Sequence, residues 1–236
     1  MRGESGLKPR QIFSKLDVVA EEVSHPFPPV DIGSPTLIES FLILALARII
    51  GPKCLLEFGT YTGYTTSIVV RNLENVEVTT IDLPRLGGDL PDPEYSLVSG
   101  GQNDIYLTSV RNSRGTPYLD ALNTNARNRV TEVEMDSTST ELFRLLEKNR
   151  FDMFFVDGGH SIETVLSDYR LVEALASERS ICIWHDYGSS LHQDVKAGLD
   201  SLNTGDNHFP ILGTSLLVSF PERSKLVLED IIDVGE

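Results

Sequence analysis

Residues 56–66 of the chain, LEFGTYTGYTT, decide its fold. The apolar residues 54–56 lead into this stretch and predict a buried strand, and a helical pattern follows it. Within the stretch, Glu57, Gly59 and Gly63 define the spacing E-x-G-x-x-x-G. Glycine lets the backbone approach a ligand closely, and the amides at the start of the next helix attract a negatively charged group. The stretch therefore predicts the strand, tight turn and helix that bind nucleotides in α/β folds.

The glycine spacing argues against a nicotinamide enzyme. No glycine stands two residues after Gly59, so the fingerprint G-x-G-x-x-G is missing. A second expected strand, Val76–Ile81, ends at Asp82, which follows Gly63 by 19 residues. An acid about 20 residues after such a turn hydrogen-bonds the ribose hydroxyls of the nucleotide. Asp82 is therefore a candidate ribose-binding residue, with an ordinary loop aspartate as the alternative.

The composition argues against nucleic-acid and membrane partners. The 236 residues carry a formal net charge of −15, whereas binding to phosphates requires a basic surface. The most apolar run, Leu37–Ile50, is too short to span a bilayer and contains Glu39 and Arg48. The N-terminus shows no apolar segment of signal-peptide length. Cys54 and Cys182 fall in expected core strands as reduced, inert thiols, which predicts a cytoplasmic protein.

Strand patterns alternate with helical patterns, which predicts a single doubly wound α/β domain with a mostly parallel sheet. Phe151–Val156 is apolar throughout, as expected of a central parallel strand covered on both faces. Further strands are expected at residues 130–135, 180–184, 209–212 and 215–220, and residues 225–230 are expected to form an edge strand or a docked tail.

Apolar residues at helical spacing predict helices at residues 8–24, 36–50, 118–128, 139–148, 161–172 and 193–202. Ser34-Pro35 is typical of an N-cap and first-turn proline, and Thr138-x-x-Glu141 is a capping-box sequence. We expect residues 1–35 to form an N-terminal helix and linker that pack on the main domain, residues 36–236.

Residues 83–117 interrupt the alternation and are rich in glycine and proline. A loop this long inside a compact domain is usually a lid, a binding segment or disordered. Because it leaves the sheet next to the candidate ribose acid Asp82, we expect a lid or a substrate-recognition segment.

Two consecutive expected strands each end in an acid, Asp157 and Asp186. Ligands of open α/β sheets bind beyond the carboxyl ends of the strands, and neighbouring strands lie about 4.8 Å apart. The two carboxylates can therefore share one cation, and Mg²⁺ prefers such oxygen ligands. Loop capping with a salt-bridge partner is the alternative role.

Residues 57–64 resemble motif I of the class I S-adenosylmethionine-dependent methyltransferases, and most of all the small-molecule O-methyltransferases related to the catechol enzymes. The stretches FDMFFVDGGHS, SICIWHDYG and ILGTSL follow in the order of that family, so the resemblance covers most of residues 53–220. It implies a Rossmann-like fold of about seven strands. It also implies a cofactor site made by Glu57, Gly59, Tyr61, Gly63, Asp82, Asp136, Ser137 and Asp157. Asp136 and Ser137 would contact the adenine, or would only cap the next helix.

The same resemblance implies catalytic roles for Asp157 and His160. His160 stands three residues after Asp157, where the catechol-type enzymes have a lysine as general base. An imidazole with a pKa near 6.5 can take a hydroxyl proton at neutral pH. Asp157 and Asp186 match two metal-binding aspartates of the cation-dependent relatives, whereas Tyr187 departs from the third position. His185 should point to the other side of its strand, as a packed histidine or a neighbour of the substrate.

These patterns predict transfer of the sulfonium methyl of S-adenosylmethionine to an oxygen of a small molecule, with Mg²⁺ as a candidate second cofactor. One alternative is a metal-dependent hydroxylase on the same fold, in which His160 or His185 holds iron with Asp157 or Asp186. Another is a non-catalytic module that binds S-adenosylmethionine and docks a partner through residues 83–117. The sequence does not name the acceptor, and a homodimer is one assembly that it permits.

Overall fold

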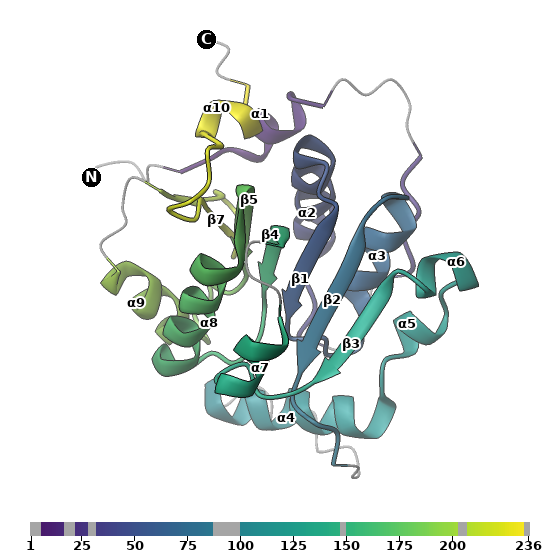
Figure 1. The fold of residues 1–236 in the computed structure, drawn as a ribbon. Coiled ribbons are helices and arrows are strands. Elements are labelled where there is room, and N and C mark those ends of the chain that lie inside the picture. Colours follow the sequence, from purple (N-terminus) through teal and green to yellow (C-terminus); the bar gives the residue numbers. More distant parts are fainter. Residues whose placement is uncertain are drawn as a thin grey trace.

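The computed structural model describes residues 6–16, 22–27, 32–86, 100–146, 150–202 and 207–233. Its described strands form one sheet in the order β3-β2-β1-β4-β5-β7-β6 (Figure 1). Five strands are parallel: β1 (Cys54–Phe58), β2 (Glu77–Asp82), β3 (Val130–Glu134), β4 (Phe151–Val156) and β5 (Ala176–Trp184). The other two are antiparallel, with β7 (Leu217–Ser219) paired to β5 and to β6 (His208–Pro210). The predicted doubly wound, mostly parallel sheet is confirmed.

Helices cover both faces of the sheet (Figure 1). One face packs on α2 (Leu37–Ile50) and α3 (Tyr64–Asn72), and the other on α8 (Ile162–Leu175) and α9 (Gln193–Ser201). The remaining helices are α1 (Pro9–Phe13), α4 (Gly100–Arg114), α5 (Pro117–Asp120), α6 (Thr124–Arg127), α7 (Thr140–Leu145) and α10 (Leu228–Ile231).

Two hydrophobic clusters lie on opposite faces of the sheet. Successive strand residues point to opposite faces, so Leu55 and Phe155 belong to one cluster, while Leu56 and Phe154 belong to the other. Because β1 and β4 are buried on both faces, their sequences are apolar almost throughout.

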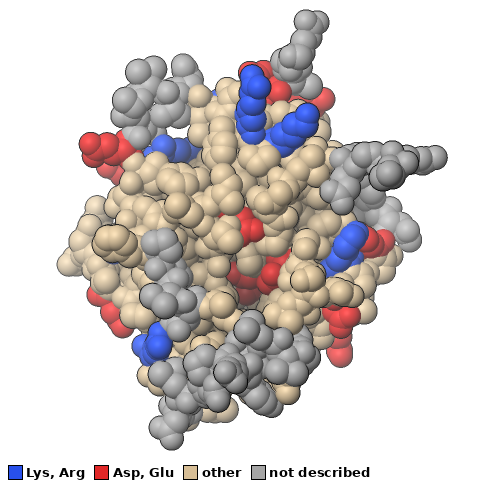
Figure 2. Space-filling model, turned by 180° about the vertical axis from the view of Figure 1, so that it is seen from behind, with Lys and Arg blue, Asp and Glu red and all other residues tan. Residues whose placement is uncertain are grey.

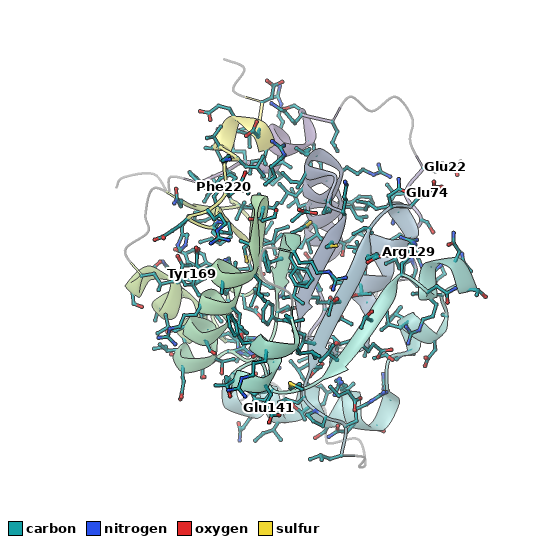
Figure 3. All side chains as sticks on the ribbon, in the orientation of Figure 1. Glu22, Glu74, Arg129, Glu141, Tyr169 and Phe220 are labelled. Atoms are coloured by element: carbon teal, nitrogen blue, oxygen red, sulfur yellow. The ribbon has the colours of Figure 1, made fainter. Side chains whose placement is uncertain are left out.

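Arg129 fastens the end of α3 to the sheet. Its guanidinium group donates hydrogen bonds to the carbonyl oxygens of Val70, Leu73 and Val76, and Figure 3 labels it at this end of β3. These three carbonyls belong to the last turn of α3 and the turn that follows it. The contact satisfies groups that a helix end otherwise leaves unpaired.

The helix expected at residues 8–24 is much shorter in the structure. α1 ends at Phe13, Ile12 is its buried residue, and part of the expected range, residues 17–21, lies outside the described residues. The next helix starts at Leu37 and is capped by Thr36 rather than by Ser34-Pro35, because Thr36 and Glu39 form a reciprocal capping box. A buried carboxylate is thus placed in an otherwise apolar helix.

Three further expectations change at the level of secondary structure. Residues 83–117 do not form a continuous loop, since α4 occupies residues 100–114, and residues 87–99 lie outside the described residues. Ser139, not Thr138, caps α7, because its hydroxyl accepts from the Leu142 amide while Thr138 donates to Asp136. Residues 225–230 contribute to the short helix α10 and not to an edge strand, and burial of Leu226 and Ile231 fits the other expectation, a docked tail.

Cys182 is buried and Cys54 is half-buried, and both are free thiols. Among the described residues, no helix combines the length and the apolar character that crossing a membrane requires.

Candidate active site

A cavity of about 710 Å³ opens where the carboxyl ends of β1, β2, β4 and β5 meet α4. Its volume is in the range of small-ligand pockets. Eight of the predicted site residues line it: Gly59, Tyr61, Asp82, Asp136, Ser137, Asp157, His160 and Asp186. Figure 2 shows acidic side chains at the bottom of a hollow near the centre of the view, while the basic side chains shown lie farther out.

The glycine turn after β1 requires both of its glycines. Gly59 has φ +91°, and a Cβ there would lie 2.0 Å from the carbonyl oxygen of Asp157. Gly63 has φ +80°, caps α3, and would place a Cβ 2.4 Å from Leu119. The turn also contains Tyr61 at φ +48°, a backbone conformation that residues other than glycine adopt only occasionally. The turn is therefore tightly packed against the loop after β4.

Two predicted site residues are not among those that line the cavity: Glu57 lies beneath the glycine turn, and Gly63 forms the end of the turn. Glu57 is fully buried and accepts hydrogen bonds from the hydroxyls of Thr66 and Thr80, both at 2.5 Å. Burial raises the pKa of Glu57 to about 8, although the two hydroxyl bonds act in the opposite direction. Glu57 therefore supports the turn from beneath and is not among the residues that line the cavity, so its expected contact with the cofactor stays a prediction.

Asp82 stands at the end of β2, as the sequence predicts, and lines the cavity. It accepts hydrogen bonds from the amides of Tyr61 at 2.8 Å and Leu83 at 2.7 Å. Arg111 of α4 forms an ion pair with it, with Nε 2.9 Å from Oδ2. Burial raises the pKa of Asp82, and the charge of Arg111 opposes this rise. No sequence pattern pointed to this arginine, which lies 29 positions after Asp82.

Asp136 and Ser137 lie in the cavity wall beyond the end of β3. Asp136 accepts from both the amide and the hydroxyl of Thr138, at 2.8 Å each, so its Oδ1 closes the turn before α7. Both alternatives for Asp136 are thus compatible with its position, because it organises this turn while lining the cavity.

The acids after β4 and β5 meet as expected, but a histidine lies between them. Nδ1 of His185 is 2.8 Å from Asp157 Oδ1 and 3.2 Å from Asp186 Oδ2. On the other side of the ring, Nε2 lies 3.6 Å from Glu39. Glu39 also accepts from the amide and hydroxyl of Ser215 at 2.7 Å. Three carboxylates therefore surround one imidazole.

The prediction that His185 points to the other side of its strand, away from this cluster, is wrong. β5 ends at Trp184, so strict alternation no longer applies at His185, and Asp186 has the left-handed φ of +59°. The signal in the sequence was Glu39, because an acid in an apolar helix requires a partner when it is buried.

The imidazoles and carboxylates shift one another's pKa values. Burial raises the pKa of Asp186, but hydrogen bonds and charges from His160 and His185 hold it well below its usual range. Burial lowers the pKa of His185, but its three carboxylate neighbours, Asp157 foremost, hold it well above its usual range. The pKa of Asp157 is raised by its burial, with His185 acting against the rise. Contacts between imidazoles and carboxylates therefore dominate the half of the cavity at the ends of β4 and β5.

His160 lies between two carboxylates. Its Nδ1 is 2.5 Å from Asp104 Oδ1, and its Nε2 is 3.2 Å from Asp186 Oδ2. Burial lowers its pKa, but Asp104 and Asp186 outweigh this effect and raise the pKa to about 9. Its ring stacks on His192, with ring centroids 3.6 Å apart and an interplanar angle of 18°. Asp104 and His192 were not identified from the sequence.

Asp157, His160 and Asp186 each offer one ligand atom within 4.8 Å of the others. Two carboxylates from neighbouring strands fit a divalent cation, and the nearby imidazoles would favour a transition metal over Mg²⁺. A second group, Asp104, His160 and His192, suits one ion poorly, because an ion in the plane of one stacked ring lies outside the plane of the other. Tyr187, at the third family position, donates instead to Asp200 at 2.8 Å.

The likeness to solved structures is one of fold. A methyltransferase from Podospora anserina bound to S-adenosylhomocysteine (SAH) aligns with a TM-score of 0.55 at 14% identity, over 80% of each chain. An O-methyltransferase from Bacillus cereus in complex with SAH gives 0.52 at 14%, over 80% of this chain and 82% of that one. A putative caffeoyl-CoA O-methyltransferase from Staphylococcus aureus gives 0.51 at 16%, over 81% and 83%. The search of curated proteins finds no match.

A family model described as a methyltransferase domain matches residues 56–187, more than half of the chain. The match begins at the strand before the glycine turn and ends directly after Asp186. The matched residues thus include both the glycine turn and the acids at the ends of β2, β4 and β5 that line the cavity. The chain therefore belongs to this methyltransferase family, as the order of its motifs predicted.

Proposed function

We propose that the protein transfers the methyl group of S-adenosylmethionine to an oxygen of a small-molecule acceptor in the 710 Å³ cavity. One observation carries the proposal: the glycine turn with Asp82 and the cluster of Asp157, His160 and Asp186 line the same cavity. The family match supports methyl transfer, and the solved structures of the same fold that hold SAH support the choice of cofactor.

The half of the cavity at the ends of β1, β2 and β3 would bind the cofactor. Gly59 and Tyr61 bring backbone close to the ligand, and Asp82 accepts hydrogen bonds from the ribose hydroxyls. Asp136 and Ser137 lie where they would meet the adenine. Glu57 and Gly63 contribute indirectly, since they hold the turn in shape.

The second half would carry out the chemistry. The acceptor oxygen attacks the methyl carbon, the C–S bond breaks as the C–O bond forms, and the acceptor proton passes to His160. With a pKa of about 9, His160 carries its own proton at neutral pH and can take the acceptor proton only after losing it. Asp186 contributes to this high pKa, so a neutralised Asp186 raises the fraction of His160 that is neutral and able to act as a base. A ligand that neutralises Asp186 therefore brings the pKa of His160 closer to neutral pH.

Asp157 and Asp186 would hold a divalent cation in this site. When bound, such a cation supplies positive charge that stabilises the acceptor oxyanion. His185 already lies between the two carboxylates, so the protein's own imidazolium offers part of that charge. The requirement for a metal is therefore a separate question from the requirement for the cofactor.

Calorimetric titration with SAH tests the cofactor half of the proposal. We expect micromolar binding, and we expect Asp82→Asn to weaken it about tenfold or more, because the variant loses a charged acceptor for the ribose. His160→Gln should leave SAH binding unchanged and abolish turnover on any acceptor found in a screen. A folded sample that binds no SAH would contradict the proposal.

The same titration and turnover assay in Mg²⁺ and in chelator tests the metal half. Chelator should leave SAH binding unchanged, because the cation would touch the acceptor rather than the cofactor. A fall in turnover assigns a cation to Asp157 and Asp186, and unchanged turnover assigns the balance of their charge to His185 and His160.

The close approach of imidazoles to Asp157 and Asp186 also favours a second candidate, a metal-dependent hydroxylase. Iron-dependent consumption of O₂ without methyl transfer would support it. Methyl transfer that persists in chelator would contradict it.

A further inference from the structure

α4 reaches across the carboxyl ends of the strands with three polar side chains (Figure 1). Asp104 contacts His160, which follows β4, at 2.5 Å. Asn103 Oδ1 lies 3.0 Å from Nε2 of His192, which caps α9. Farther along the helix, Arg111 pairs with Asp82 at the end of β2. One helix from the segment that interrupts the α/β alternation thus contacts both halves of the cavity.

The contacts fix His160 on every side that matters for proton transfer. Its Nδ1 faces Asp104, its Nε2 faces Asp186 and the cavity, and one face of its ring lies on His192. Both ring nitrogens face a carboxylate, but the contact of Nδ1 with Asp104, at 2.5 Å, is shorter than that of Nε2 with Asp186, at 3.2 Å. In the neutral ring the shorter contact favours the proton on Nδ1, which leaves Nε2 to exchange a proton with a ligand in the cavity.

We propose that Asp104 is a positioning residue for His160, accepting a hydrogen bond from Nδ1–H so that Nε2 faces the acceptor in the cavity. This inference rests on the proposed function, in which His160 takes the acceptor proton. Asp104 itself would not touch the substrate. Its contribution is to select the Nδ1–H tautomer and to hold the ring plane against His192.

The stacked histidine strengthens this assignment. His192 is buried, and its ring lies parallel to the ring of His160, with the centroids 3.6 Å apart, so it blocks rotation of that ring on one face. Asn103, next to Asp104 on α4, anchors His192 in turn. Adjacent residues of one helix therefore restrain both members of the stacked pair.

Nitrogen-15 NMR of the histidine rings in the full chain tests the proposal without an acceptor. Signals of His160 are assigned by their loss in His160→Gln. In the native protein we expect a hydrogen-bonded Nδ1 proton that is lost in Asp104→Asn and retained in Asp104→Glu, which preserves the carboxylate. Asp120→Asn, which removes an exposed charge outside the cavity wall, is the matched control and should leave the signal unchanged. A His160 Nδ1 signal unchanged in Asp104→Asn would overturn the proposal.

Steady-state kinetics adds a second readout. Asp104→Asn should lower kcat about 10- to 100-fold, as loss of a partner that orients a catalytic histidine does, with little change in KM for S-adenosylmethionine. Asp104→Glu should restore part of kcat. Equal kcat values for the native protein and Asp104→Asn would overturn the proposal.

The two experiments separate this inference from the proposed function. If SAH does not bind and no acceptor is methylated, the proposed function fails, while the NMR result still decides whether Asp104 orients His160. If Asp104→Asn does not fold, Asp104→Ser and Asp104→Glu allow the same comparison, because only the second retains the carboxylate.

Discussion

The surroundings of two carboxylates at the same edge of the sheet, Glu57 in β1 and Asp186 after β5, shift their pKa values in opposite directions. Among the described residues, Glu57 accepts from two hydroxyls at 2.5 Å, and burial raises its pKa to about 8. Asp186 lies within 3.2 Å of His160 and of His185, which hold its pKa well below its usual range. Burial alone therefore does not set the charge of an acid here; the neighbouring donor does. Hydroxyl hydrogen bonds thus support the glycine turn at Glu57, whereas contacts with imidazoles hold the acid after β5.

The largest effect that we predict comes from disrupting the glycine turn at its closest contact, between Gly59 and Asp157. Gly59→Ala should lower the free energy of unfolding by more than about 3 kcal/mol, because its Cβ would meet the Asp157 backbone and the residue keeps a left-handed φ. Gly51→Ala is the control, since Gly51 has φ +61° and nothing within 4 Å of a Cβ. It should cost about 1 kcal/mol. Urea unfolding measures both, and equal losses would show that the close approach does not matter.

The next largest effect comes from removing the imidazole that lies between the carboxylates at the ends of β4 and β5. His185→Gln should lower the free energy of unfolding by about 3 kcal/mol, because Asp157, Asp186 and Glu39 would face one another without their shared imidazolium. Added Mg²⁺ should raise the Tm of this variant more than that of the native protein. His208→Gln, on β6 outside the cavity wall, loses an edge-on contact with Tyr169 and is the control for the ion: Mg²⁺ should raise its Tm no more than that of the native protein. A Tm that does not respond to Mg²⁺ would argue against cation binding at the two aspartates.

The smallest effect that we predict is a pH dependence of the unfolding free energy that comes from Glu57. Glu57 has a folded-state pKa of about 8, above its usual value of 4.5, so the native state binds the proton more tightly than the unfolded state. Stability from this group is present below pH 4.5 and is lost as the pH rises toward 8. Glu57→Gln removes the ionisation. Its unfolding free energy relative to the native protein should rise by about 2 kcal/mol between pH 6 and 8. A pH-independent difference in urea unfolding would show that Glu57 ionises normally.

The sequence predicted the sheet and the glycine turn well because these features depend on local patterns. Apolar runs such as Phe151–Val156 follow from burial of both strand faces, and Gly59 from a turn that tolerates no Cβ. The strand-end acids Asp157 and Asp186 were also predicted to meet, since parallel strands end at one edge. The roles of Asp104 and His160 in orienting and moving a proton stay predictions.

The missed features depend on contacts between distant parts of the chain. α4 has low apolar content, so periodicity did not show it, and its partners Asp82 and His160 lie far away in sequence. The helix expected at residues 8–24 had the right apolar spacing, but the chain beyond Phe13 leaves the helix. Glu57 matched the position of a cofactor ligand, yet burial beneath the turn decides its role.

The position of α4 has a consequence for the order of events in turnover. Because Arg111 and Asp104 belong to one helix, any ligand that displaces Arg111 from Asp82 also acts on the segment that holds His160. Thermodynamic linkage then requires the reverse: an acceptor that changes the docking of α4 must alter cofactor affinity by the same factor. The two substrates would thus influence each other's affinity through α4, in addition to their direct contact at the transferred methyl group.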